Sequence, residues 1–111
     1  MVIIKIIEIT LLVLMAHMFG DYFLQTDYLA KNKGKDNYVL LIHCILYSLG
    51  IGLVFDIFGI TLTAIDLALI STLHFPIDYI KARGITSKMF GNKNALILDQ
   101  IIHYIVLLLF I

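Results

Sequence analysis

The sequence contains little charge, one cysteine, one proline and no tryptophan. Only 14% of its 111 residues are charged, and eight basic side chains balance eight acidic ones. This balance excludes the basic surface that nucleic acid binds, so we expect no nucleic-acid partner. The single cysteine, Cys44, excludes an internal disulfide. Apolar residues, in contrast, are abundant: 61% of the residues are hydrophobic and the mean hydropathy is +1.00. The composition predicts an integral membrane protein, with the lipid bilayer as its partner.

Four apolar stretches are long enough to cross a bilayer, which takes about 20 helical residues. They lie at about 2–24, 38–57, 60–80 and 94–111. We therefore expect an all-α fold, a single four-transmembrane-helix bundle over 1–111 built from two helical hairpins. No small-x-small cleavage site follows the first stretch, so we expect it to be a retained span.

The basic residues predict how the chain is oriented. In a four-span protein the two polar connections, at about 31–37 and 83–94, fall on the same side of the membrane. Short loops rich in Lys and Arg stay in the cytoplasm, which leaves both termini outside and Lys5 on the outer side. Seven of the eight basic residues lie in these connections or at their edges: Lys31, Lys33, Lys35, Lys81, Arg83, Lys88 and Lys93.

Two short motifs recur in the same order along the chain. HMFGDY at 17–22 matches HFPIDY at 74–79 in its His, Asp and Tyr, and LIHCIL at 41–46 matches IIHYIV at 101–106 in its His. We therefore predict a duplicated hairpin. Because each copy has an even number of spans, a pseudo-twofold axis along the membrane normal would relate the copies and bring matched residues together. The two repeats cover about 2–57 and 60–111.

Histidine and aspartate side chains gather at one predicted depth, near the cytoplasmic ends of the helices. Several are paired four residues apart, as His17 is with Asp21, and so share one helix face. An ionisable residue at the centre of a bilayer costs about 2.5–3.5 kcal/mol, so a group of them requires mutual compensation. The group contains every histidine of the chain: His17, Asp21, His43, His74, Asp78, Asp99 and His103.

This group predicts a metal site with those seven residues as ligands. Imidazoles and carboxylates from several helices are the ligands of non-haem Zn, Mn or Fe centres, and seven are more than one tetrahedral ion can use. We expect one or two divalent transition-metal ions. The leading hypothesis is a metal-dependent hydrolase of a lipid-like or small-molecule substrate. The metal would activate water, and Asp99 or Asp21 would be the catalytic base that accepts the proton.

Four further polar residues lie beside this group in the sequence. Gln25 and Gln100 are predicted to hydrogen-bond the ligand residues or to cap the interface. Lys81 and Arg83 are predicted to be either a phosphate or headgroup site at the mouth of the metal site or simple anchors at the cytoplasmic surface.

The quoted motifs together resemble a small bacterial integral-membrane family catalogued as domain of unknown function 3307. The stretches that carry the resemblance are HMFGDYFLQTD at 17–27, LIH at 41–43, HFPIDYIKAR at 74–83 and DQIIH at 99–103. The resemblance covers nearly the entire chain. It implies a protein of the bacterial inner membrane, and it brings no activity or ligand with it because the family is described as uncharacterised.

Two other functions stay open at this point. The His/Asp group could be the relay of an ion- or proton-coupled small transporter, with Asp66 extending polarity toward the far side. Four spans would then have to form a homo-oligomer. The group could also be a structural polar plug that holds the helices in register without catalysis. Bis-histidine haem is disfavoured, because the carboxylates lie where a porphyrin needs an apolar wall.

Overall fold

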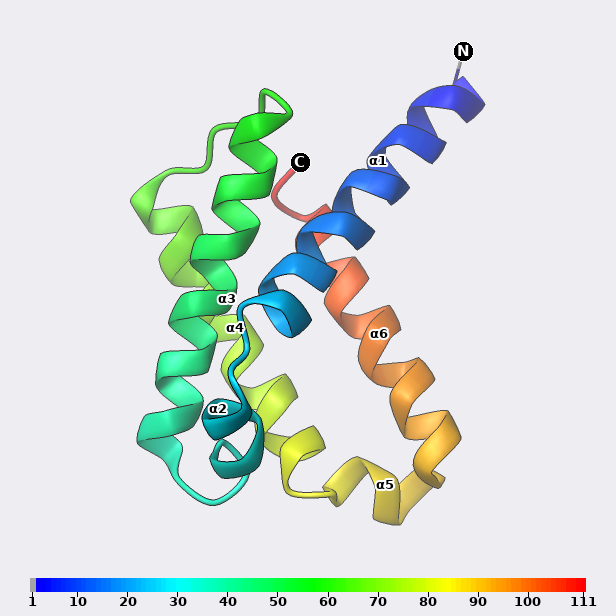
Figure 1. The fold of residues 1–111 in the computed structure, drawn as a ribbon. Helices are drawn as coiled ribbons and strands as arrows, with labels where there is room; N and C mark the ends of the chain where they lie inside the picture. The colour runs from blue at the N-terminus through cyan, green and yellow to red at the C-terminus, as the bar shows by residue number, and fades with distance from the viewer. Residues whose placement is uncertain (1) are drawn as a thin grey trace.

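The computed structural model describes residues 2–111 and is all-α, which confirms the all-α part of the predicted fold class. Two long helices, a π-helical turn and a short helix form the first half, and a long, a short and a long helix form the second (Figure 1). In chain order the elements are α1 (Val2–Met18), η1 (Phe19–Phe23), α2 (Asp27–Asn32), α3 (Asn37–Ile57), α4 (Ala64–Ala82), α5 (Ile85–Phe90) and α6 (Asn92–Leu108).

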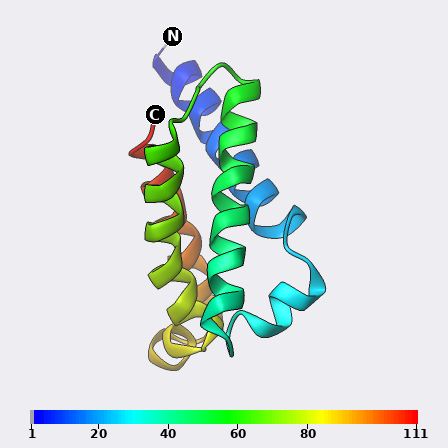
Figure 2. The ribbon, with the colours of Figure 1, turned by 90° about the vertical axis from the view of Figure 1, so that its left-hand side faces the viewer.

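The four long helices pack in a closed circuit: α1 contacts α3 and α6, and α4 contacts α3 and α6. Helices α3 and α4 run side by side, as the turned view shows (Figure 2). The short helices α2 and α5 lie at one end of the molecule, whereas both termini and the α3–α4 connection lie at the other (Figure 1). The two predicted polar connections are therefore at the same end; α2 ends within the first, and α5 lies within the second.

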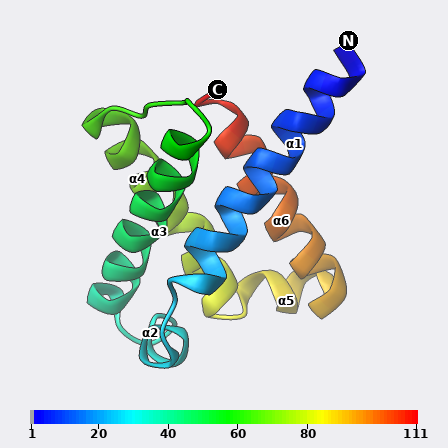
Figure 3. The same ribbon diagram turned by 45° about the horizontal axis from the view of Figure 1, so that its top comes forward.

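An apolar core fills the part of the bundle nearer the termini. Helices α1, α3, α4 and α6 all contribute to it, and it is made of Val13, Ala16, Tyr47, Ile51, Val54, Phe55, Ile70 and Leu107. The first two turns of α1 extend past this core (Figure 3). Val2 and Ile3 there are each 73% exposed, so this part of α1 has an apolar surface that the rest of the chain leaves uncovered.

Two helical segments, Val2–Phe23 and Asn37–Ile57, are long and apolar enough to cross a membrane. They support membrane association. The other two predicted spans, α4 and α6, do not meet the same length and hydropathy criteria.

Helix α4 begins at Ala64, later than the sequence suggested, because of a local cap. The backbone N–H of Asp66 donates to Thr63 Oγ1 over 3.1 Å, and the Thr63 N–H donates to Asp66 Oδ2 over 3.0 Å. This reciprocal pair satisfies two backbone donors at the helix start. Asp66 therefore caps the start of α4.

Candidate metal site

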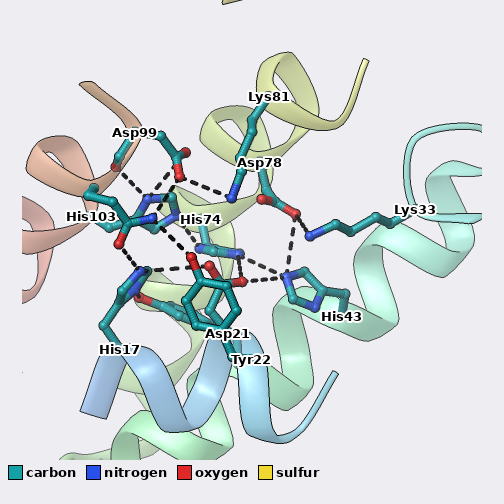
Figure 4. Close-up of polar contacts among 12 residues, drawn as sticks. His17, Asp21, Tyr22, Lys33, His43, His74, Asp78, Lys81, Asp99 and His103 are labelled. Atoms are coloured by element: carbon teal, nitrogen blue, oxygen red, sulfur yellow. Dashed lines mark hydrogen bonds and ion pairs between the residues drawn. The ribbon is translucent and has the colours of Figure 1, made fainter. Parts of the chain in front are cut away.

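The seven predicted histidines and aspartates are all buried, with exposures of 4% or less. They come from five elements that meet at one level of the bundle (Figure 4). Their sources are α1 for His17, η1 for Asp21, α3 for His43, α4 for His74 and Asp78, and α6 for Asp99 and His103.

Four of the seven, Asp21, His43, His74 and Asp78, point ligand atoms at a common centre, and we call them the donor group. The four atoms lie within 4.8 Å of one another. His43 Nε2 is 3.2 Å from His74 Nε2, 3.2 Å from Asp21 Oδ1 and 3.4 Å from Asp78 Oδ2. Ligands about 2.0–2.1 Å from a tetrahedral ion would be about 3.3 Å apart. The three distances from His43 Nε2 therefore match a tetrahedral metal site, whereas His74 Nε2 and Asp21 Oδ1 are 4.0 Å apart and all four atoms lie within 4.8 Å, so the group would have to contract slightly around an ion.

The carboxylates of the donor group are short of hydrogen-bond donors. Both oxygens of Asp21 and Oδ1 of Asp78 are buried and accept no hydrogen bond within residues 2–111, although His43 Nε2 lies 3.2 Å from Asp21 Oδ1. Buried polar atoms nearly always have a partner, so these oxygens are unusual. A cation at the common centre would satisfy them.

Asp21 reaches this centre through the π-helical turn η1, which continues from α1. Such turns are frequent at functional sites. The side chains of His17 and Asp21 stay neighbours, as their four-residue spacing predicts, with His17 Nε2 3.7 Å from Asp21 Oδ2. Each also contacts a different helix: Asp21 Oδ1 lies 3.2 Å from His43 Nε2 on α3, and His17 Nε2 bonds to Gln100 on α6.

The remaining three of the seven residues, His17, Asp99 and His103, form with Gln100 what we call the supporting group. The donor group and the supporting group together are called the layer. His103 Nε2 is 3.0 Å from His74 Nδ1, and His103 Nδ1 is 2.7 Å from the backbone oxygen of Asp99. His17 Nε2 is 3.0 Å from Gln100 Oε1, and Gln100 Nε2 donates to Asp99 Oδ2 over 3.2 Å. The supporting group thus contacts the donor group through the His74–His103 pair.

A family model with the description "Protein of unknown function (DUF3307)" matches residues 9–111. The chain belongs to this family. No curated protein and no solved structure matches the chain significantly. Membership in the DUF3307 family confirms the resemblance that the motifs carried, and the family description assigns no activity, so the roles of these residues rest on their geometry.

Two lysines enter the layer of this DUF3307 protein and neutralise carboxylates. Lys33 Nζ is 2.9 Å from Asp78 Oδ2, and Lys81 Nζ is 3.1 Å from Asp99 Oδ2. Lys33 and Lys81 thus each pair with one carboxylate of the layer. Lys33 resembles the other loop lysines in sequence, so its place in the layer was not predicted.

Tyr47 is a site residue that the sequence reasoning missed. Its ring stacks on His74 with centroids 3.8 Å apart, and its hydroxyl is 2.9 Å from His17 Nδ1. It lies four residues after His43 on α3 and so faces the same way, a signal that the sequence did contain.

Of the four flanking residues predicted to assist the site, two take part in the layer and two do not. Gln100 and Lys81 take part in the layer, as described above. The side chain of Arg83 instead donates to Asn37 Oδ1 over 2.7 Å and stacks on Tyr79. Gln25 Oε1 is buried and accepts no hydrogen bond from the described residues. The hydrogen-bond network of the layer includes neither Arg83 nor Gln25.

Proposed function

We propose that this protein spans a membrane with four helices, binds one divalent transition-metal ion at the donor group, and uses that ion for hydrolysis. The observation that carries the proposal is the convergence of four buried ligand atoms within 4.8 Å of one another. The spacing of these atoms is close to that of a tetrahedral site, and three of the carboxylate oxygens around it accept no hydrogen bond from residues 2–111.

The lengths of α4 and α6 support four spans. Their 19 and 17 residues extend over about 28 and 26 Å, close to the hydrocarbon thickness of about 30 Å. The polar residues that lower their hydropathy, such as His74 and Asp99, are buried inside the bundle. The exposed surface of these two helices is rich in aliphatic side chains: Ile65, Leu69, Leu73, Leu96, Ile97, Ile101 and Ile105.

The arrangement of the ends supports the predicted orientation and duplication. The lysine-rich connections with α2 and α5 would lie in the cytoplasm, and both termini would lie outside. Each half of the chain has the same order of a long, a short and a long helix. We propose that the halves are duplicated hairpins related by a pseudo-twofold axis along the membrane normal.

The donor set favours Zn, Mn or Fe. Imidazole and carboxylate ligands suit these ions, and mixed His and Asp sets are more typical of catalytic zinc sites than of structural ones, where Cys is common. The ion pairs of the layer also leave room for a cation. Three buried aspartates face two lysines, so one carboxylate, that of Asp21, has no lysine partner, and a bound cation would supply one.

The proposed hydrolysis places the catalytic base at Asp21. Of the two bases predicted from the sequence, Asp99 is held by Lys81 and Gln100, whereas Asp21 belongs to the donor group. Four protein ligands fill a tetrahedral site, so Asp21 would have to leave the ion for water to bind there, and its freed carboxylate could then accept the proton of the activated water. The donor atoms are buried, so side chains of the layer would have to move to admit a substrate.

The first test is the metal content of protein purified in detergent from metal-supplemented cells. We expect about one transition-metal ion per chain in the wild type, removable by chelation and restored by added Zn²⁺. Wild-type protein that contains no stoichiometric metal would refute the proposal.

The second test is hydrolysis of a panel of amphiphilic carboxylic and phosphate esters by the metal-loaded protein in nanodiscs. We expect activity that chelation removes and that Asp21→Asn lacks. Asp27→Asn, at an exposed position of α2, is the matched control. Equal rates for the wild type and Asp21→Asn would contradict the hydrolase part of the proposal and leave metal binding to be judged by the first test.

Ion- or proton-coupled transport is the second candidate, and one observation favours it. His43, His74 and His103 form a chain with nitrogen-to-nitrogen distances of 3.2 and 3.0 Å, which is suited to proton relay. Proton or Zn²⁺ flux into liposomes that disappears in His74→Ala would favour transport over hydrolysis. Flux equal to that of empty liposomes would eliminate it.

A further inference from the structure

The hydrogen bonds around His103 decide which nitrogen of His74 carries a proton. His103 Nδ1 is 2.7 Å from the backbone oxygen of Asp99. A carbonyl oxygen only accepts, so His103 Nδ1 must donate, and in a neutral imidazole Nε2 is then the acceptor. That nitrogen lies 3.0 Å from His74 Nδ1, which must therefore be the donor of this pair. The lone pair of His74 is left on Nε2.

The lone pair of His74 is directed at the donor group. Its Nε2 lies 3.2 Å from His43 Nε2 and 4.0 Å from Asp21 Oδ1. His43 Nε2 is therefore the donor of the histidine pair in the metal-free protein, and its proton would be released when a metal binds. A metal ligand must present a deprotonated nitrogen, and the second nitrogen of a ligating His usually donates to a fixed acceptor. Here that acceptor is another histidine, His103, which is itself anchored to the backbone of α6.

The same reasoning excludes His17 as a ligand. Gln100 Nε2 faces a carboxylate oxygen of Asp99, which only accepts, so the amide orientation is fixed and Gln100 Oε1 faces His17. His17 Nε2 therefore donates to Gln100, and His17 Nδ1 accepts from the hydroxyl of Tyr47. Both ring nitrogens are engaged away from the common centre.

We infer that only two of the four histidines, His43 and His74, bind the metal, and that His103 and His17 are positioning residues. His103 fixes the tautomer of His74. His17 connects α1 to α3 and α6 through Tyr47 and Gln100. This assignment rests on the proposed metal site and reduces the seven ligands expected from the sequence to four: Asp21, His43, His74 and Asp78.

The experiment is X-ray absorption spectroscopy on the full chain loaded with Zn²⁺ in detergent, combined with Zn²⁺ affinity from competition with a chromophoric chelator. We expect two imidazole ligands in the wild type, in His103→Gln and in His17→Gln. Three or four imidazoles in the wild type, or the loss of one in His103→Gln, would overturn the assignment. Failure of the metal-site proposal itself is distinguishable, because the wild type would then bind no Zn²⁺.

The Zn²⁺ affinity of His103 variants shows whether His103 positions a ligand or is itself a ligand. Loss of a partner that orients a ligand typically weakens metal binding about 10–100-fold, and we expect His103→Ala to fall in that range. We expect His103→Gln to recover most of that loss, because the amide oxygen can accept from His74 Nδ1 and the amide nitrogen can donate to the Asp99 carbonyl. His74→Gln should show no such recovery.

A purely structural role for His103 predicts a different result. It would lower the melting temperature of the metal-free protein in both variants and leave Zn²⁺ affinity unchanged. Equal affinity losses in His103→Gln and His103→Ala would also contradict the tautomer role.

Discussion

The donor group and the supporting group both contain histidine and aspartate at the same depth, yet their polar atoms differ in their hydrogen bonding. In the supporting group, both nitrogens of His17 and of His103 have a partner, and one carboxylate oxygen, Asp99 Oδ1, accepts no hydrogen bond from the described residues. In the donor group, three carboxylate oxygens accept no hydrogen bond from the described residues, and four ligand atoms crowd together. Residue type and depth therefore locate the layer, whereas hydrogen bonding distinguishes the atoms that could bind an ion from those that hold them in place.

Asp78→Asn should have the largest effect of the substitutions that test this difference, because it removes a ligand of the donor group. The change removes a charged ligand and leaves the buried ammonium of Lys33 without its partner, 2.9 Å away. We expect Zn²⁺ affinity to fall by more than about 100-fold, beyond the usual cost of losing a supporting residue. Competition with a chelator measures this, with Asp27→Asn as the control. Retention of Zn²⁺ affinity in Asp78→Asn would remove Asp78 from the donor group.

Lys33→Met tests the Asp78 carboxylate by removing the ammonium group that pairs with it. Without metal, loss of one partner of a buried ion pair costs about 3–5 kcal/mol, and we expect a free energy of unfolding lower by that amount. The Lys33 side chain is 10% exposed and that of Lys81 is 31% exposed, so Lys81→Met should cost less. Reversible unfolding in mixed detergent micelles measures both.

The metal should change the effect of Lys33→Met. Because a divalent ion also neutralises Asp78, we expect saturating Zn²⁺ to reduce the destabilisation. A cost for Lys33→Met that is the same with and without Zn²⁺ would place Asp78 outside the metal site.

Gly20→Ala should perturb the donor group through the backbone. An added Cβ would lie 2.9 Å from the backbone oxygen of Tyr47, so η1 would have to shift, and Asp21 would shift with it. We expect a loss of about 1–3 kcal/mol in unfolding free energy and a measurable loss of Zn²⁺ affinity. Gly52→Ala is the matched control, because its Cβ would meet only the flexible end of Leu67. Equal effects of the two substitutions would contradict this account of the close α1–α3 contact.

Tyr47→Phe should have the smallest effect. It keeps the ring stacked on His74 and removes only the hydroxyl that bonds His17 Nδ1. We expect a cost of about 1 kcal/mol in thermal or detergent unfolding and nearly unchanged Zn²⁺ affinity. Tyr38→Phe, at a position that is 69% exposed, is the control. A large affinity loss in Tyr47→Phe would mean that His17 is a ligand after all.

The sequence could predict the helices and the membership of the buried layer for physical reasons. Apolar length predicted the approximate positions of the four long helices, and the expected cost of ionisable groups in hydrocarbon predicted that residues such as His43 and His103 face inward. Helical spacing placed His74 and Asp78 on one face, and both belong to the donor group in the structure.

The remaining features depend on tertiary contacts that spacing does not encode. Lys31, Lys33 and Lys35 are alike in local sequence, and only the path of α2 brings Lys33 to Asp78. The spacing of His17 and Asp21 correctly predicts one shared direction, but it does not show that Asp21 also approaches His43 or that His17 also bonds to Gln100. Whether a histidine is a ligand or a positioning residue depends on hydrogen-bond donors and acceptors contributed by other helices, which the spacing of residues along the sequence does not predict.

The most direct test of the central claim is an anomalous difference map from crystals of the protein loaded with Zn²⁺, recorded at the zinc absorption edge. The account predicts one peak, about 2.0–2.2 Å from Nε2 of His43 and His74 and from a carboxylate oxygen of Asp21 and Asp78. A peak coordinated by His17 or His103, or the absence of a peak within the layer, would contradict it.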